Sequence, residues 1–184
     1  MAGSIDVIWN TVREEFSDLQ DLAAFTRVFV RLMLAVILGG ILGYERQLTG
    51  KPAGLRTHML VSLGAALFVL VPLQSGMPVN DVSRVLQGVI AGIGFLGAGA
   101  IIKMSEEGQI KGLTTAASIW LTAAIGVAAG LGREATAVFA TVLALIILGA
   151  LHKLDKWIAR SAKHRNAHTA PAGSAPRELA SHEE

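Results

Sequence analysis

Residues 113–131 of this chain are LTTAASIWLTAAIGVAAGL, a run of 19 residues without a single Asp, Glu, Lys or Arg. Four further apolar runs flank it, at 25–43, 57–74, 86–102 and 135–151. An α-helix rises about 1.5 Å per residue, so roughly 20 apolar residues cross the hydrocarbon of a bilayer. The sequence therefore predicts an all-α integral membrane protein, a compact bundle of about five transmembrane helices.

The composition supports this class. Of the 184 residues 52% are hydrophobic and only 16% charged, whereas soluble domains carry about a quarter charged residues. The mean hydropathy is +0.53. No cysteine is present, which excludes disulfides and thiolate chemistry. The net charge of +2 comes without aromatic residues among the basic ones, so we expect no nucleic-acid partner.

The basic residues predict the orientation. Eleven of the 16 Lys and Arg residues fall in the segments that share one side of the membrane with the C-terminus. Cytoplasmic loops are enriched in Lys and Arg. We therefore expect the N-terminus outside and the C-terminus in the cytoplasm.

Three regions follow from these patterns. Residues 1–24 are polar, with apolar residues at helical spacing, and predict an amphipathic helix at the membrane surface. Residues 25–151 form the predicted transmembrane domain. Residues 152–184 are basic and then small, polar and Pro-containing, which predicts a disordered cytoplasmic tail.

Glycines recur at four-residue spacing in three of the apolar runs. Such glycines let helix backbones approach closely in lipid, and the packing partner can be in this chain or in another copy. The glycines expected to pack helices are Gly39, Gly43, Gly88, Gly92, Gly94, Gly97, Gly99, Gly126 and Gly130. Run 86–102, the richest in glycine, is consistent with either a continuous or a broken helix. Its segment GIGFLG matches G-x-G-x-x-G, but no acidic residue follows at the required distance, so no dinucleotide or other cofactor is expected.

The link between the first two runs is densely charged, with Glu45, Arg46, Lys51 and Arg56, and His58 directly follows it. One interpretation is a topology signal with side chains reaching the interface. The other is a site for an anionic headgroup or a protein partner, in which Glu45 pairs with Arg46 or with Arg56. Lys51 is followed by proline, which excludes an ATP-binding P-loop.

The polar candidates inside the membrane are few. They are Gln87, Thr114, Thr115, Ser118 and Thr122. Runs 86–102 and 113–131 hold no acidic residue, whereas divalent cations prefer several carboxylates or carbonyls, so no metal site is expected. Arg31 lies within the first run and needs an anionic partner, for which Asp81 is a candidate. No catalytic motif is visible, and we expect no enzyme.

Several motifs resemble a known family. The chain has G-Y-E-R-Q at 43–47 and K-P-A-G-L-R-T at 51–57, then GIGFLGAG at 92–99 and KGLTTAA at 111–117. Over about residues 25–150 it resembles the MgtC/SapB family. The resemblance implies a bacterial inner-membrane protein linked to low-magnesium adaptation, acid tolerance and survival inside host cells. Members are generally regarded as regulators of other membrane machinery.

The chain ends 33 residues after the fifth run, which predicts a short form without the soluble C-terminal domain of MgtC proper. We expect a multi-pass regulatory or interaction protein of the inner membrane, working on another membrane protein and able to form a homo-oligomer. The alternative is a small oligomeric transporter or channel for Mg²⁺ or another ion.

Overall fold

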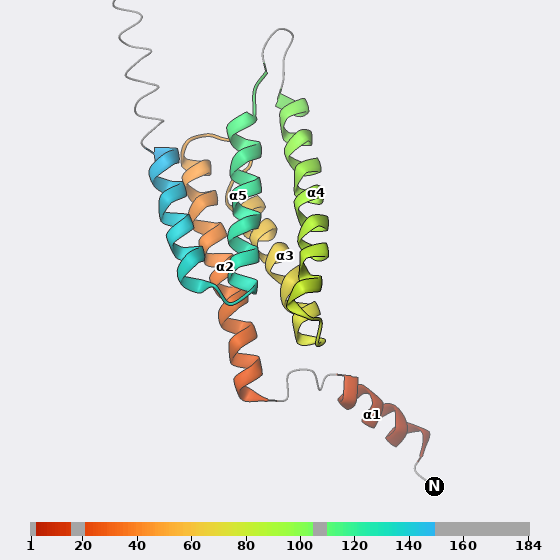
Figure 1. Ribbon diagram of the computed structural model, residues 1–184. Helices are drawn as coiled ribbons and strands as arrows, with labels where there is room; N and C mark the ends of the chain where they lie inside the picture. The colour runs from red at the N-terminus through yellow and green to blue at the C-terminus, as the bar shows by residue number, and fades with distance from the viewer. Residues whose placement is uncertain (1–2, 16–20, 105–109, 150–184) are drawn as a thin grey trace, which may run out of the picture. The chain divides into compact units, whose positions relative to one another are not determined.

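The computed structural model describes residues 3–15, 21–104 and 110–149 of the chain. It contains α1 (Ser4–Glu15), α2 (Leu22–Leu48), α3 (Leu55–Gln74), α4 (Val79–Met104) and α5 (Leu113–Gly130). A further helix covers Glu134–Gly149, drawn in blue in Figure 1. Every regular element among the described residues is helical, so the predicted all-α class is confirmed.

Four helices, α2 to α5, are long and apolar enough to cross a membrane. The helix Glu134–Gly149 is apolar but shorter, and the end of the fifth predicted run, residues 150–151, lies outside the described residues. A multi-pass membrane protein is thus supported by four helices, and the fifth span stays a prediction.

Local signals set the helix ends. The Asp21 carboxylate accepts hydrogen bonds from the backbone N–H groups of Ala23 (3.1 Å) and Ala24 (3.3 Å), which caps α2. Gly112, at φ +93°, precedes α5, in a conformation that favours glycine. The glycine-rich α4 is one continuous helix from Val79 to Met104. The broken-helix alternative is therefore wrong for this span.

Helix α3 is held between α2 and α5, and α2 also contacts α5, whereas among the described helices α1 to α5 the contacts of α4 are with α5 and α3. Glycines form these close approaches. A Cβ placed on Gly39 would lie 2.6 Å from the carbonyl oxygen of His58, and one on Gly43 would lie 2.7 Å from Leu55 Cα. From α5, Gly126 lies against the carbonyl of Ser62, and a Cβ on Gly130 would lie 2.5 Å from that of Ala66. These four predicted packing glycines do bring backbones together.

The glycines of α4 behave differently. A Cβ on Gly88, Gly92, Gly94 or Gly99 would meet no neighbouring atom within 4 Å, and one on Gly97 would make only an ordinary contact with Ala116. Within the described part of this chain no helix packs closely on Gly88, Gly92 or Gly99, and packing on another copy, the alternative left open by the sequence, stays a prediction. Gly88 and Gly92 face α3 across an open groove, so α4 does not come close enough for its glycines to bring backbones together.

The chain divides into two compact units, residues 1–145 and 146–184. Helices α1 to α5 belong to the first, and only residues 146–149 of the second are described. The predicted tail at 152–184 lies outside the described residues. The predicted N-terminal helix is present as α1, and its place at a membrane surface stays a prediction.

Candidate functional site

Two neighbouring residues near the C-terminal end of α2 form a nearly buried ion pair. The Arg46 guanidinium donates from Nε to Glu45 Oε2 at 2.5 Å and from Nη2 to Oε1 at 3.0 Å. The Arg46 side chain is 3% exposed and that of Glu45 19%. This two-pronged geometry gives strong charge-assisted hydrogen bonds. Of the two pairings open from sequence, Glu45 therefore makes the one with Arg46.

The other two charged residues of the predicted cluster do not join this pair. Arg56, in the first turn of α3, is exposed, and Lys51 is half-buried in the connecting loop. The loop is held by the Lys51 backbone N–H, which donates to the carbonyl of Arg46 at 2.9 Å. The structure thus divides the predicted cluster into a buried pair and two cations on or near the surface.

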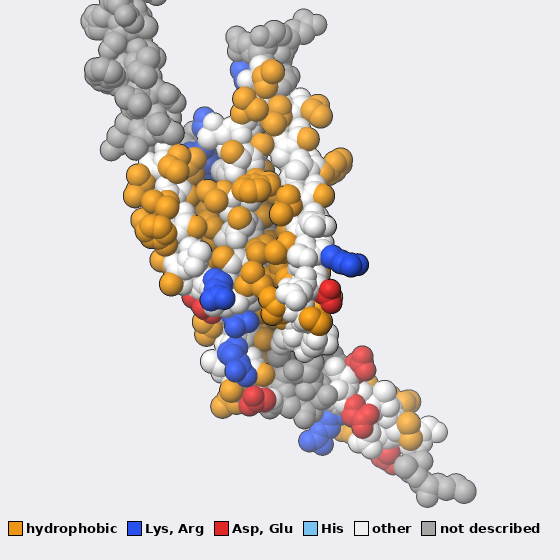
Figure 2. Space-filling view, in the orientation of Figure 1, with side chains coloured by type: hydrophobic (Ala, Val, Ile, Leu, Met, Phe, Trp, Pro, Cys, Tyr) orange, Lys and Arg blue, Asp and Glu red, His pale blue; other side chains and the backbone are white. Residues whose placement is uncertain are grey.

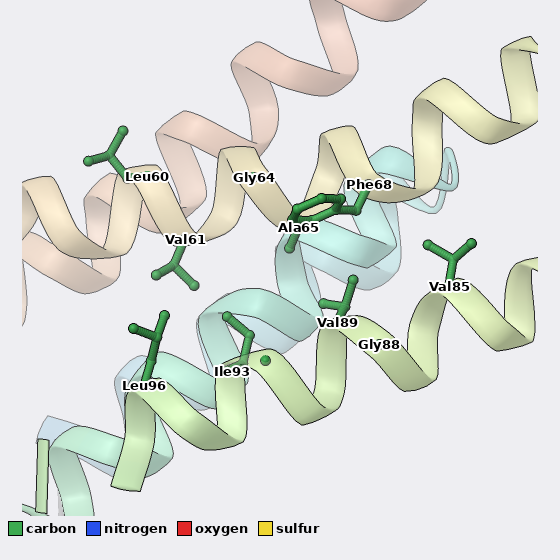
Figure 3. Close-up of a pocket in the computed structure, with 11 residues that line it drawn as sticks. Leu60, Val61, Gly64, Ala65, Phe68, Val85, Gly88, Val89, Ile93 and Leu96 are labelled. Carbon is green, nitrogen blue, oxygen red and sulfur yellow. The ribbon is translucent and has the colours of Figure 1, made fainter. Parts of the chain in front are cut away.

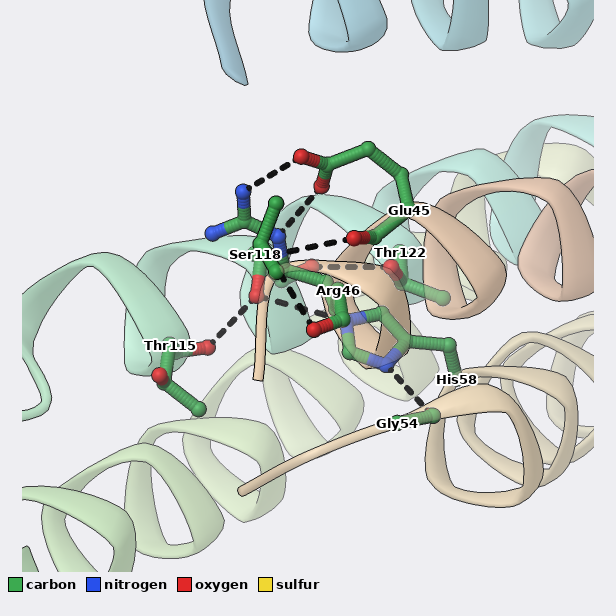
Figure 4. A network of polar contacts seen from close by, with 8 residues as sticks. Glu45, Arg46, Gly54, His58, Thr115, Ser118 and Thr122 are labelled. Carbon is green, nitrogen blue, oxygen red and sulfur yellow. Dashed lines mark hydrogen bonds and ion pairs between the residues drawn. The ribbon is translucent and has the colours of Figure 1, made fainter. Parts of the chain in front are cut away.

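His58, which the sequence analysis placed next to the charged loop but not in the predicted site, is the main residue that the structure adds to the site. It is fully buried in α3, and its Nδ1 donates to the carbonyl of Gly54 at 2.9 Å, because a carbonyl can only accept. Its Nε2 lies 3.2 Å from Ser118 Oγ on α5. The ring therefore links two helices, as Figure 4 shows. The only sequence signal is a histidine directly after the loop motif, one turn into the span.

Three of the five predicted polar residues gather beside His58. Thr115, Ser118 and Thr122 are buried on α5, whereas Gln87 and Thr114 are exposed elsewhere. The Ser118 hydroxyl donates to the carbonyl of Thr115, and the Thr122 hydroxyl to that of Ser118, both at 2.8 Å. Since a hydroxyl has one proton, Ser118 can donate either to this carbonyl or to His58, not to both.

Two buried polar atoms have no hydrogen-bond partner among the described residues. They are Arg46 Nη1 and Ser62 Oγ. Leaving such an atom unsatisfied costs about 1–3 kcal/mol, so buried polar side chains usually have a functional or structural reason to be there. No three His, Asp or Glu residues come together to hold a metal within the ranges described. The contact between His58 and Ser118 joins α3 to α5. Helix α2 is joined to the start of α3 by Gln47, whose Oε1 accepts from the Leu55 backbone N–H at 3.3 Å.

A cavity of about 620 Å³ lies elsewhere, as an open groove between α3 and α4. Figure 3 shows the two rows of side chains facing each other across it. Its walls are apolar, so it offers no ligands to an ion. The lining residues are Leu60, Val61, Gly64, Ala65, Phe68, Val85, Gly88, Val89, Gly92, Ile93 and Leu96.

Comparison with known proteins places this arrangement in a family. The model of the MgtC family matches residues 32–157. This chain belongs to the MgtC family. The match includes the Glu45–Arg46 pair, His58 and the hydroxyls of α5, so the candidate site lies within the family's domain. The resemblance to this family predicted from the sequence is confirmed.

Similarity to curated proteins supports the same family. The chain is 43% identical to protein SrpB of Synechococcus elongatus over 71% of its length and 79% of that protein. It is 43% identical to the putative magnesium transporter YhiD of Escherichia coli K12, over 68% of this chain and 60% of that protein. Protein MgtC of Brucella abortus is 42% identical over 72% of this chain and 55% of that protein. The chain thus spans less than two thirds of YhiD and MgtC. No solved structure matches it.

Proposed function

We propose that this MgtC-family protein is a regulator that binds another protein of the bacterial inner membrane, and that it neither catalyses a reaction nor conducts an ion. The observation that carries this proposal is the bonding of the buried hydroxyls. The Thr122 hydroxyl donates to the carbonyl of Ser118, and the Ser118 hydroxyl is engaged by the Thr115 carbonyl and His58. Both side chains are buried and already bonded within the protein. An ion crossing a membrane needs groups that replace its water.

The exposed cations next to the buried pair are the surface on which such a regulator would bind. Arg56 is exposed and Lys51 half-exposed, at the end of the helices that carries the Glu45–Arg46 pair. The pair and His58 would then keep the loop in shape, and the two cations would make the contact. We further propose that this end faces the cytoplasm, as the distribution of Lys and Arg favours.

The test of the binding surface uses Arg56→Ala and Lys51→Ala, with Arg84→Ala as the matched control. Arg84 is an exposed arginine at the N-terminal end of α4. Its replacement removes one positive charge, as the other two do, but away from the proposed binding surface. All three variants should accumulate like the wild type. Only Arg56→Ala and Lys51→Ala should lose growth support in low magnesium and crosslinking to the partner. Full function in both variants would reject this surface.

Transport is the second candidate, because a relative with 43% identity is named a putative magnesium transporter. The purified chain in sealed liposomes should show no saturable Mg²⁺ uptake above that of empty vesicles, with or without an imposed potential. Saturable uptake that Ser118→Ala or His58→Ala abolishes would replace the regulator by a transporter.

The orientation can be tested in the same cysteine-free chain. Single cysteines at Ser75, in the link between α3 and α4, and at Ser105, in the link between α4 and α5, should react with an impermeant thiol reagent from opposite sides. We expect Ser75→Cys to react in intact cells and Ser105→Cys only after lysis. The reverse pattern would put the candidate site outside.

A further inference from the structure

At the opposite end of α2 from the candidate site lies a second cavity, of about 420 Å³, with a different chemistry. Two arginines one helical turn apart, Arg27 and Arg31, line it together with Gln74 at the end of α3. The rest of the wall is apolar, from Ala24, Val28 and Leu70. Figure 2 shows Lys and Arg side chains near the start of α2, below a surface of hydrophobic side chains.

Arg31 is held in place by the end of α5 and by the helix that follows it. Its Nη1 donates to the carbonyl of Gly130 at 3.3 Å, and its Nε lies 3.8 Å from Glu134 Oε1. The carboxylate next to Arg31 is therefore that of Glu134, and the expected pairing with Asp81 is wrong. The guanidinium also packs on Gly132, where any Cβ would collide with it. Gly132 has φ +74°, so glycine is favoured there for its backbone as well.

The two guanidiniums keep donors to spare. A guanidinium has five N–H donors, and the bond to Gly130 is the one hydrogen bond that Arg31 makes within the described ranges. Arg27 lies 4.0 Å from Asp21, whose carboxylate is already engaged in capping α2. Neither Asp21 nor Glu134 lines the cavity. The charge that faces the cavity is therefore positive, although both carboxylates lie close by.

The position of the cavity along α2 fits the boundary between hydrocarbon and headgroups of a membrane. Arg27 and Arg46 are 19 residues apart on one continuous helix, which is about 28 Å at 1.5 Å per residue. That is close to the roughly 30 Å thickness of the hydrocarbon. With Arg46 at one boundary, Arg27 lies at the other and Arg31 one turn inside it. Arginines pair well with phosphate through two parallel hydrogen bonds.

We propose that this cavity binds the phosphate of an anionic phospholipid, with Arg27, Arg31 and Gln74 on the headgroup and the apolar wall against an acyl chain. The polar lining alone would equally suit a free phosphate ion. The wall of Ala24, Val28 and Leu70 favours the lipid, because it offers apolar contact directly next to the cations. The site is separate from the proposed regulatory surface and does not depend on it.

The test counts phospholipids retained by the purified full chain in native mass spectrometry. Phosphatidylglycerol and phosphatidylcholine with the same acyl chains are offered in equal amounts. Since each surface arginine favours an anionic lipid by a few fold, we expect roughly 10- to 30-fold preference for phosphatidylglycerol. Arg27→Gln/Arg31→Gln should lose it, and Arg27→Gln alone, at an exposed side chain, should lose part of it. Arg84→Gln, which removes an exposed charge at the same end of the helices, should keep it.

A second variant separates the lipid from the free ion. Ala24→Phe keeps both arginines but fills the apolar wall, so it should retain less phosphatidylglycerol. Saturable binding of inorganic phosphate without lipid, equally tight in Ala24→Phe, would overturn the lipid assignment. Equal retention of the two lipids by the wild type would overturn the site itself. So would equal loss of preference in Arg84→Gln and in the double variant.

Discussion

The two faces of α3 differ in how closely the glycine-containing helices beside them approach. On one face, Gly39 and Gly43 of α2 and Gly126 and Gly130 of α5 lie against its backbone. On the other, Gly88 and Gly92 of α4 line an open apolar groove and meet nothing within 4 Å. The same four-residue spacing occurs in α4 and α5, so the spacing alone does not say whether a glycine packs. The separation of the helix from the neighbour that its glycines face does, and α4 lies across an open groove from α3.

Among the substitutions that test this difference, Gly126→Leu is expected to change the stability most. Gly126 lies directly against the Ser62 carbonyl, and a backbone atom cannot move aside as the tip of a side chain can. We expect a loss of stability above about 3 kcal/mol, beyond the usual cost of overpacking. Thermal unfolding in detergent, together with the amount that accumulates in membranes, measures it. A Tm equal to that of the wild type would mean that α5 does not approach α3 this closely.

Ser62→Ala tests the same closely packed face of α3, but here the expected change is a gain in stability. Ser62 Oγ is buried and has no partner among the described residues, so its removal should raise stability by about 1 kcal/mol. Thr122→Val is the matched control, because the Thr122 hydroxyl donates to the Ser118 carbonyl. It should lower stability by about 1 kcal/mol. A loss of stability in Ser62→Ala would indicate that this hydroxyl binds a group such as a trapped water.

Gly92→Leu should have the smallest effect on the monomer. The added side chain would enter the open groove between α3 and α4, and leucine favours a helix over glycine by up to about 1 kcal/mol. We expect an unchanged or slightly higher Tm. The oligomeric state, measured by crosslinking in membranes, tests whether a helix of another copy packs on these glycines. A change there, with the monomer intact, would show that another helix packs on these glycines.

Membrane character and the positions of four long helices could be predicted from residues alone, although α2 and α4 extend beyond the predicted runs 25–43 and 86–102. The transfer of each side chain into hydrocarbon is largely its own property, so an apolar run of sufficient length predicts a helix. Residues 113–131 correspond to α5 at 113–130, and 57–74 to α3 at 55–74. The charged loop was likewise visible as a cluster, because its members are close in sequence.

The contacts within the site depended on the tertiary structure. That Glu45 pairs with Arg46 and not with Arg56, and that His58 reaches Ser118 across 60 residues of chain, follows from how α2, α3 and α5 are rotated against one another. The same holds for Arg31, which meets Gly130 and Glu134 and not Asp81. Such rotations are set by the sum of many weak packing contacts between helices. No local stretch of sequence contains that sum, so the pattern indicated which residues were candidates and the packing determined their partners.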